Sequence, residues 1–207
     1  MSVVAAAGPL NCLITGVGGQ GTVLLSRLIG ETAIRKGMDV RGSETIGMAQ
    51  RGGSVVSHLR IGPGVFSPLI PPGTADLIIA FECAEALRVL PFLAPTGNML
   101  TLDRTLPPPQ ATASDPAAII AHLQNLLAGR LTIVPWDDLL KRCGSPRVSN
   151  VALLGAAIAR GFLPFSVDEI SAVLKTRIPP RYLDMNLTAL TSATSTRFLP
   201  AYNPSGV

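Results

Sequence analysis

Charged residues are scarce in this sequence of 207 residues. Asp, Glu, Lys and Arg together make up 14% of the chain, against ~25% in ordinary soluble domains. A chain this poor in charge cannot cover its whole surface with charged side chains. We therefore expect a large part of the surface to be buried against a partner chain. The alternative is a composition biased toward Ala and Pro, without any partner.

Cysteine, histidine and aromatic residues are also few. The three cysteines, Cys12, Cys83 and Cys143, are far apart and show no C-x-x-C spacing, and there are two histidines. We therefore predict no iron–sulfur or zinc site in this chain, and buried free thiols. The net charge of +4 is scattered, with 4% aromatic residues and no basic run, so nucleic acid is not a predicted partner.

Long hydrophobic runs and export signals are absent as well. Residues 1–10 contain no basic residue and only a short apolar core, unlike a signal peptide. The apolar run at residues 151–159 is far shorter than the ~20 residues that span a bilayer. The sequence thus predicts no membrane association and a cytoplasmic location.

The most informative stretch lies near the N-terminus, where a short apolar run ends in a cluster of glycines. Residues 12–22 read C-L-I-T-G-V-G-G-Q-G-T, and a segment with apolar residues at helical spacing follows at once. This order predicts a strand, a tight turn and a helix. Gly16, Gly18 and Gly21 fit G-x-G-x-x-G, whose backbone N–H groups face an anionic group at the helix N-terminus. The same pattern also occurs where a strand packs closely on a helix, and both interpretations stay open.

A second unusual stretch, residues 44–54, reads E-T-I-G-M-A-Q-R-G-G-S and shows no periodicity. We expect a loop at the C-terminal end of a strand, where ligands bind in open α/β sheets. Glu44 stands where a dinucleotide-binding domain has its ribose-binding carboxylate, or else it pairs with a nearby arginine. Arg51, preceded by Gln50 and followed by two glycines, suits bidentate capture of a carboxylate or phosphate. Alternatively, Arg51 fixes its own loop by donating to backbone carbonyls.

The remaining candidates favour structural interpretations. Thr22 stands where a P-loop has its lysine, which excludes a Walker A motif. Glu82 and Glu85, one helical turn apart, could act as acid and base. The favoured interpretation is a solvated first turn that complements the helix dipole, or an interface feature. His58, in a predicted strand, favours a core or interface role, and Asn150 is expected to cap or open a helix.

Strand and helix patterns alternate through the chain and then give way to helices. They predict an α/β fold with a helical C-terminal part. Because the loop before residue 54 is too short for a crossover helix, the strand that follows should run antiparallel to its neighbour. The strands after the first are predicted at 39–44, 54–61, 76–81, 97–102 and 131–135. The helices are a first one ending at Arg35, then 83–93, 116–128, 136–143, 150–160, 170–177 and 181–191.

Domain limits follow from the same patterns. We expect a flexible N-terminus at residues 1–9, a single domain at 10–195 with a helical extension at about 146–195, and a tail at 196–207. Ser166 and Glu169 have the spacing of a capping box before the penultimate helix.

Taken together, residues 11–21 and 44–54 resemble the gamma subunit, or gamma domain, of 2-oxoacid:ferredoxin oxidoreductases. Further matches occur in the same order: S-P-L-I-P at 67–71, G-T-A-D at 73–76, Glu82 with Glu85-Ala86, and Asn150 followed by L-G-A at 154–156. The resemblance covers residues 10 to 190, except that residues 107–116 and the segment after Asn186 match weakly. It is strongest to the separate small subunit of the indolepyruvate-oxidising members.

This resemblance implies a three-layer α/β/α Rossmann-like domain with a mostly parallel, mixed sheet. It also implies a subunit of an oxidoreductase that oxidatively decarboxylates a 2-oxoacid, here indolepyruvate or another aryl pyruvate, to an acyl-CoA. It implies that a larger alpha subunit carries thiamine diphosphate and 4Fe–4S clusters, that ferredoxin accepts the electrons, and that coenzyme A binds at the interface. The chain has neither a G-D-G…N-N thiamine motif nor a cysteine cluster, so it would hold none of these groups by itself and would be inactive alone.

The resemblance also implies site residues, with no metal ligand among them. A loop on the phosphate side would comprise Gly16, Gly18, Gly19, Gln20 and Gly21. A facing loop near the cofactor would comprise Glu44, Gln50, Arg51, Gly52 and Gly53. Of these, Gln50 and Arg51 would support catalysis, although no residue is a certain catalytic group. The glycine pattern and Glu44 also allow an alternative, a free-standing dinucleotide-binding oxidoreductase or redox sensor.

Overall fold

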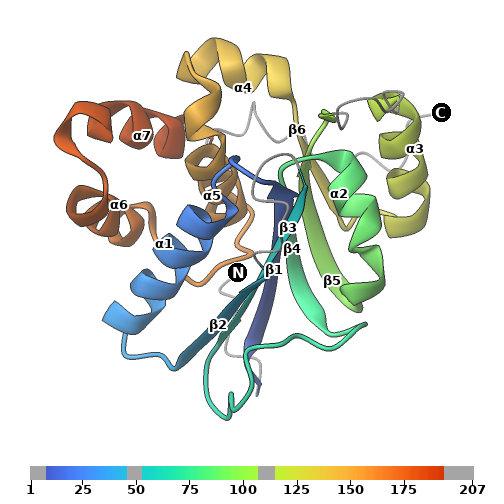
Figure 1. Ribbon diagram of the computed structural model, residues 1–207, viewed down its shortest axis with the longest axis horizontal. Helices are drawn as coiled ribbons and strands as arrows, with labels where there is room; N and C mark the ends of the chain where they lie inside the picture. Colours follow the sequence, from blue (N-terminus) through green and yellow to red (C-terminus); the bar gives the residue numbers. More distant parts are fainter. Residues whose placement is uncertain (1–7, 46–52, 107–114, 194–207) are drawn as a thin grey trace.

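A mixed six-stranded sheet forms the centre of the described part of the chain (Figure 1). The structure is a computed structural model and describes residues 8–45, 53–106 and 115–193. The strands are β1 (Leu10–Val17), β2 (Val40–Thr45), β3 (Ser54–Ile61), β4 (Ala75–Ala80), β5 (Leu93–Leu102) and β6 (Leu131–Val134). The helices are α1 (Thr22–Arg35), α2 (Cys83–Arg88), α3 (Pro116–Leu127), α4 (Trp136–Cys143), α5 (Ser149–Ala159), α6 (Val167–Arg177) and α7 (Pro180–Ser192), with short 3-10 helices at Leu90–Phe92 and Pro146–Val148.

The strand order is β2-β3-β1-β4-β5-β6. The strands β1, β4, β5 and β6 are parallel, whereas β3 pairs antiparallel with both β1 and β2. The antiparallel direction of the strand at 54–61 was predicted from the short preceding connection and is confirmed. One consequence matters for the site: β3 lies between β2 and the strand that carries the glycine loop.

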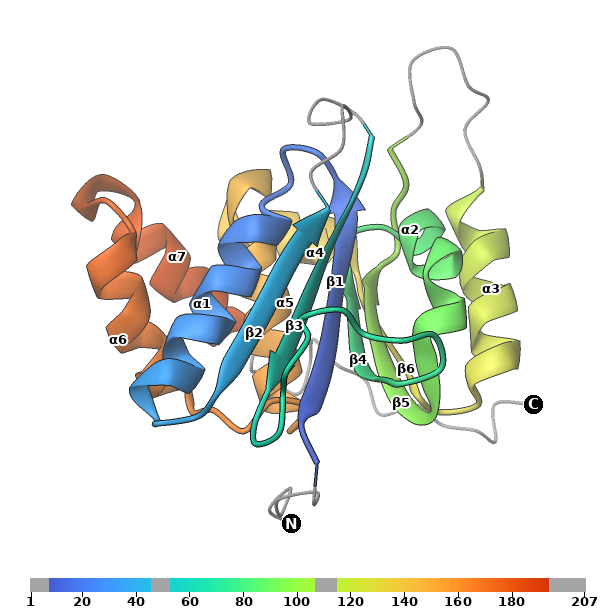
Figure 2. The ribbon, with the colours of Figure 1, turned by 60° about the horizontal axis from the view of Figure 1, so that its bottom comes forward.

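Helices cover both faces of this sheet (Figure 2). Successive residues of β1 point to opposite faces, so Cys12 and Ile14 pack with α1 and α5, while Leu13 packs on the side of α2 and α3. The helices α6 and α7 lie outside α1 and α5 and pack against them. The predicted three-layer α/β/α fold with a helical C-terminal part is thereby confirmed.

The predicted helix at 83–93 is shorter in the structure. Helix α2 ends at Arg88, a 3-10 turn containing Pro91 follows, and β5 begins at Leu93 rather than at residue 97. Proline has no N–H to continue the helical ladder, and its ring clashes with the preceding turn. The apolar periodicity through Leu93 therefore continued past the physical end of the helix.

The C-terminal helices pack closely through small residues. A Cβ atom built at Gly155 of α5 would collide with the carbonyl oxygen of Leu190 in α7. The predicted capping box is confirmed, because the Ser166 hydroxyl accepts from the Glu169 N–H and the Glu169 carboxylate accepts from the Ser166 N–H. In the described ranges, no helix is both long and apolar enough to cross a membrane. The predicted N-terminal segment 1–9 and tail 196–207 lie wholly or largely outside these ranges.

Candidate functional site

The glycine loop lies at the carboxyl end of β1, directly before α1 (Figure 2). Gly21 is the N-cap residue of the helix, with φ of +92°, and as a glycine it offers no side chain to cap the first N–H groups of α1. A Cβ atom at this position would lie 2.6 Å from Nδ2 of Asn150, a residue buried at the start of α5. Both the backbone conformation and the contact therefore require glycine here. As predicted, Asn150 lies in the first turn of a helix.

Gln20 closes the loop from within. Its side-chain Oε1 accepts from the N–H of Val17 at 2.7 Å, and its Nε2 donates to Glu82 at 2.5 Å. A Cβ atom at Gly16 would meet the same Oε1, so glycine makes room for the folded-back side chain. Gln20 lines the adjoining cleft, but its amide is engaged in holding the loop.

Glu82 lies at the centre of this arrangement. Its exposed fraction is 1%, and Oε2 accepts from the N–H of Leu106 at 2.7 Å while Oε1 accepts from Gln20. Burial raises the pKa of this carboxyl, although the two donors oppose the shift. The solvated first turn predicted for Glu82 is wrong, because the end of β4 places the residue inside, where it joins the glycine loop to the segment after β5.

Glu85 makes a corresponding connection on the other side. It is 5% exposed, and its Oε2 accepts from the Ser54 hydroxyl at 2.5 Å and from Thr15 at 3.4 Å. The N–H of Gly18 also donates to the carbonyl of Gly53 at 2.9 Å. The solvated role is therefore wrong for Glu85 too. Its contacts fix the base of the second stretch beside the glycine loop, which brings Gly18 and Gly53 together.

A cleft of about 320 Å³ opens in front of these groups. Its lining consists of Gly19, Gln20, Gly21, Phe81, Leu102, Arg104, Leu106, Pro146, Arg147, Ser149 and Asn150. Among these described lining residues, two are arginines and none is a carboxylate. The guanidinium of Arg104 stacks over the ring of Trp136 at 3.9 Å. Burial lowers the pKa of Arg104, and nearby Glu82 opposes that shift.

Sequence reasoning missed Arg104 and Arg147 as site residues. The available signal was the position of Arg104 directly after a predicted parallel strand, at the edge where ligands bind in open α/β sheets. Arg147 had no such signal, because it comes to the cleft on the 3-10 helix between α4 and α5.

Glu44 lies elsewhere in the structure. It stands near the end of β2 and lines a groove between α1 and β2 together with Arg27, not the cleft. Because β3 separates β2 from β1, the two strands are about 10 Å apart at the usual strand spacing. The predicted residues Gln50, Arg51 and Gly52 lie outside the described residues, and Gly53 is the described member of that loop.

The other titratable candidates are structural. His58 is 8% exposed, its Nδ1 accepts from the N–H of Ile70 at 3.1 Å, and burial lowers its pKa. The predicted core role of His58 is thus confirmed. The three cysteines are free and buried, as predicted. Burial raises the pKa of Cys12 to about 12 and that of Cys83 to about 11, far from a reactive thiolate. Nowhere in the described ranges do three His, Cys, Asp or Glu side chains come together as a possible metal site.

The sequence matches a family model described as pyruvate ferredoxin/flavodoxin oxidoreductase over residues 11–196. Among curated relatives, it is 37% identical over 186 residues to indolepyruvate oxidoreductase subunit IorB of Archaeoglobus fulgidus, covering 87% of this chain and 92% of the relative. It is 35% identical over 184 residues to the protein of the same name from Thermococcus kodakarensis, covering 86% and 91%.

Solved structures with the same fold include pyruvate oxidoreductase subunit PORC of Thermotoga maritima, with a TM-score of 0.69 at 17% identity, covering 95% of this chain and 99% of that one. The fold also matches 30% of a chain of a 2-oxoglutarate:ferredoxin oxidoreductase from Magnetococcus marinus, with a TM-score of 0.66 at 19% identity, covering 90% of this chain. That structure is described as having 2-oxoglutarate, coenzyme A and succinyl-CoA bound.

Proposed function

Because the chain belongs to the pyruvate ferredoxin/flavodoxin oxidoreductase family, we propose that it is the small subunit of a cytoplasmic 2-oxoacid:ferredoxin oxidoreductase acting on indolepyruvate or another aryl pyruvate. The observation that carries this proposal is the similarity to the indolepyruvate oxidoreductase subunits over more than four fifths of both chains. The family match also supports residues 10–195 as one functional domain.

The proposed enzyme divides its chemistry between two chains. The larger partner carries thiamine diphosphate and the iron–sulfur clusters and passes electrons to ferredoxin. The described residues of this chain do not suit a cluster, because its three cysteines are buried singly and no group of metal-ligating side chains comes together. Its part is to bind and orient, and it is inactive alone.

Coenzyme A fits the cleft better than a neutral ligand does. The lining carries two guanidinium groups and no carboxylate, and coenzyme A is polyanionic. The glycine loop contributes backbone at the N-terminus of α1, and Phe81, Leu102 and Leu106 contribute apolar surface. When bound, coenzyme A supplies the thiol that accepts the acyl group, and this chain holds it at the wall of the partner's active site.

Co-purification tests the proposal. The tagged chain should bring down a larger chain that contains iron and thiamine diphosphate, and the pair should oxidise indolepyruvate with a viologen or ferredoxin as acceptor. The separated chain should show no such activity. Full 2-oxoacid oxidation by this chain alone, or tight binding of NAD to it in calorimetry, would contradict the proposal and favour a dinucleotide-binding protein.

The role proposed for the second loop is tested at Arg51. We predict that Arg51→Ala leaves the complex assembled and lowers turnover or the affinity for coenzyme A about tenfold or more, because a charge-assisted hydrogen bond is lost. Arg41→Ala is a suitable control, since Arg41 is exposed on β2 and donates only to the adjacent carbonyl of Val40 in the described structure. Normal kinetics in Arg51→Ala would assign Arg51 to fixing its own loop.

A further inference from the structure

We propose that Arg104 and Arg147 form the subsite that binds the phosphate groups of coenzyme A. This inference rests on the proposed function, but it identifies residues that neither motif contains. Both residues line the cleft, together with Gly19, Gln20 and Gly21 of the glycine loop. An arginine pair of this kind suits phosphate oxygens because each guanidinium offers several N–H donors in one plane.

Arg104 is held in place by its surroundings. The Asp103 carboxylate accepts from the N–H of Trp136 at 2.7 Å, and the N–H of Cys83 donates to the carbonyl of Arg104 at 3.0 Å. Two residues later, the N–H of Leu106 donates to Glu82. The segment 103–106 is therefore fixed on both sides, and stacking on Trp136 orients the guanidinium. A ligand would meet a preorganised cation.

Arg147 reaches the cleft from a different segment, the 3-10 helix before α5. Its backbone N–H donates to the Ser145 hydroxyl at 3.2 Å, which caps the 3-10 helix Pro146–Val148. The Arg147 side chain is exposed and has no carboxylate within ion-pair distance among the described residues. Arg104 is half-buried and also has no carboxylate within ion-pair distance among the described residues. A guanidinium without such a partner keeps its donors available for an anionic ligand.

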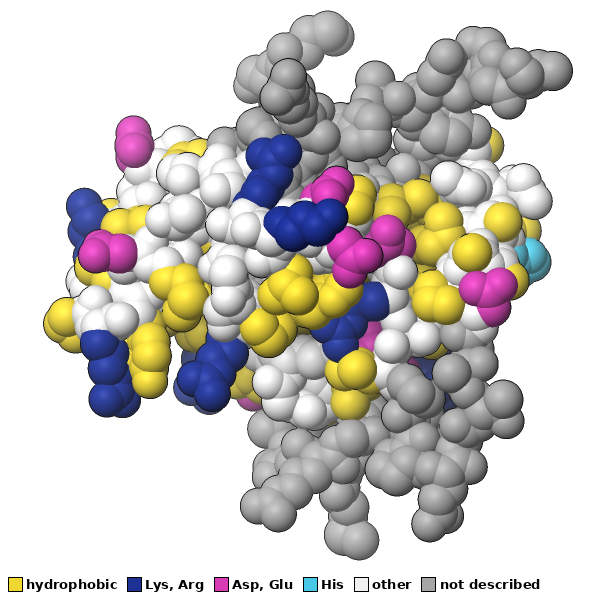
Figure 3. All heavy atoms as spheres, turned by 90° about the horizontal axis from the view of Figure 1, so that it is seen from above, with side chains coloured by type: hydrophobic (Ala, Val, Ile, Leu, Met, Phe, Trp, Pro, Cys, Tyr) yellow, Lys and Arg dark blue, Asp and Glu magenta, His cyan; other side chains and the backbone are white. Residues whose placement is uncertain are grey.

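Three other arginines of the described structure are paired with carboxylates. Arg35 and Arg177 pair with Glu31, and Arg88 pairs with Glu85. On the face shown in Figure 3, basic side chains are interspersed with acidic and apolar ones. The cleft departs from this mixed pattern, because Arg104 and Arg147 are the only charged residues in the described part of its lining. The Glu82 carboxylate is buried and accepts hydrogen bonds from Gln20 and Leu106, which line the cleft.

The test uses the assembled complex and removes charge without removing bulk. Arg104→Met keeps a side chain over Trp136, Arg104→Lys restores the charge, and Arg147→Ala truncates the exposed partner. Arg181→Ala is the matched control, because Arg181 also stacks on an aromatic ring, that of Tyr182 at 4.7 Å, but does not line the cleft. Calorimetry measures binding of coenzyme A and of inorganic pyrophosphate, and steady-state kinetics compares coenzyme A with pantetheine, which lacks all phosphates.

We expect Arg104→Met to weaken binding of coenzyme A and pyrophosphate about tenfold to a hundredfold, as for loss of a charge-assisted hydrogen bond. Arg147→Ala should weaken both in the same direction, Arg104→Lys should recover part of the loss, and Arg181→Ala should change nothing. The KM for pantetheine should be the same in all variants. Equal losses for coenzyme A and pantetheine, or unchanged binding of coenzyme A, would overturn the assignment.

Pyrophosphate separates this inference from the proposed function. If the complex used no coenzyme A at all, the acyl acceptor in the proposed function would be wrong. Binding of pyrophosphate that is lost in Arg104→Met and kept in Arg181→Ala would then still support an anion site at the two arginines. Pyrophosphate binding that is equal in all four variants would overturn it.

Discussion

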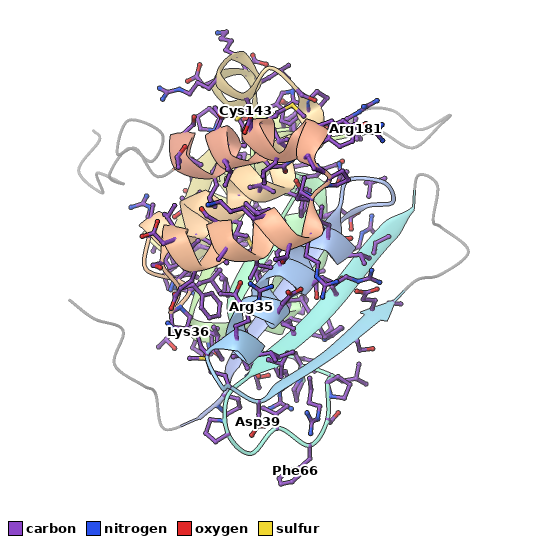
Figure 4. All side chains as sticks on the ribbon, turned by 90° about the vertical axis from the view of Figure 1, so that its left-hand side faces the viewer. Arg35, Lys36, Asp39, Phe66, Cys143 and Arg181 are labelled. Carbon is purple, nitrogen blue, oxygen red and sulfur yellow. The ribbon has the colours of Figure 1, made fainter. Side chains whose placement is uncertain are left out.

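Acidic residues are used in two opposite ways in this molecule. Beneath the cleft, Glu82 and Glu85 are buried and accept hydrogen bonds mainly from neutral groups. On the outer side of α1, Glu31 and Glu169 are more exposed and pair with arginine or lysine. Figure 4 shows Arg35 and Lys36 at the end of α1. The Lys36–Glu169 and Arg177–Glu31 pairs connect this region to α6, and Arg35 pairs with Glu31 within α1.

The two groups of carboxylates differ in the free energy that is lost when their interactions are broken. A buried carboxylate that loses its donors, or donors that lose their carboxylate, must bear the full desolvation penalty. An exposed ion pair that is broken regains water and loses little. The buried hydrogen bonds at the carboxyl end of the sheet therefore contribute more to stability. They hold the glycine loop, the 103–106 segment and the base of the second loop in place. The outer pairs add only a minor contribution to the packing of α1 on α6.

Removal of one carboxylate from each region is expected to give the largest difference in stability between the two regions. We expect Glu82→Ala to lower the free energy of unfolding by about 2–4 kcal/mol, because the donors on Gln20 and Leu106 lose their acceptor inside the protein. Glu31→Ala should cost about 1 kcal/mol or less. Urea unfolding of both variants measures the two values. Equal losses would show that burial does not separate the two regions.

Replacement of glycine by alanine at the two ends of α1 compares a crowded position beside the cleft with an open one on the surface. Gly21 and Gly37 both have positive φ, but a Cβ atom at Gly21 would meet buried Asn150, whereas one at Gly37 meets nothing within 4 Å. We expect Gly21→Ala to cost about 2–3 kcal/mol and Gly37→Ala about 1 kcal/mol, the strain of a left-handed alanine alone. Thermal unfolding compares them, and a larger loss at Gly37 would contradict the steric argument.

The pH dependence should have opposite signs in the two regions. Burial raises the pKa of Glu82 above its ordinary value of 4.5, so its stabilising contribution is present below pH 4.5 and lost as pH rises through the raised pKa. The Lys36 ammonium lowers the pKa of Glu169 below 4.5, so that contribution is present above pH 4.5 and lost as pH falls. Lowering the pH should therefore increase the stability of the wild type relative to Glu82→Gln and decrease it relative to Glu169→Gln.

Urea midpoints from pH 3 to pH 8 measure both differences, with Asp138→Gln as a control, since Asp138 is exposed and its contact with Lys141 is long, at 3.8 Å. Parallel pH trends for the Glu82 and Glu169 variants would contradict the assignment of burial as the dominant cause at Glu82.

The comparison also explains what the sequence could and could not predict. The order of strands and helices, the antiparallel strand at 54–61 and the glycine loop follow from local patterns, because periodicity and turn residues act within a few positions. The burial of Glu82 does not, because it depends on donors at Gln20 and Leu106, 62 and 24 residues away along the chain. A carboxylate at the start of a helix looks the same in sequence whether it is solvated or buried.

The cleft could not be predicted from the sequence either, because it too is formed by residues that are far apart along the chain. Arg104 and Arg147 are 43 positions apart and meet only because β5 and the turn before α5 end at the same edge of the sheet. For Glu44, the local pattern led to a wrong placement beside the glycine loop. Its distance from that loop along the chain suits a dinucleotide site, but β3 lies between the two strands. The distance between Glu44 and the glycine loop along the chain does not reveal that a third strand lies between them.

The smallest expected effect is the coupling within a single pair, measured in each region by a double-mutant cycle. Lys36 and Glu169 lie 2.7 Å apart on the surface, so Lys36→Met with Glu169→Gln should give a coupling of about 0.2–1 kcal/mol that largely disappears in 1 M salt. Gln20→Ala with Glu82→Gln should give a coupling of about 1–2 kcal/mol, because the Glu82 carboxylate is buried and Gln20 is partly buried. Salt should leave that value unchanged, since mobile ions do not reach the buried carboxylate. A salt-sensitive coupling between Gln20 and Glu82 would mean that water reaches the base of the cleft, and the contrast between the two regions would then be one of geometry rather than of burial.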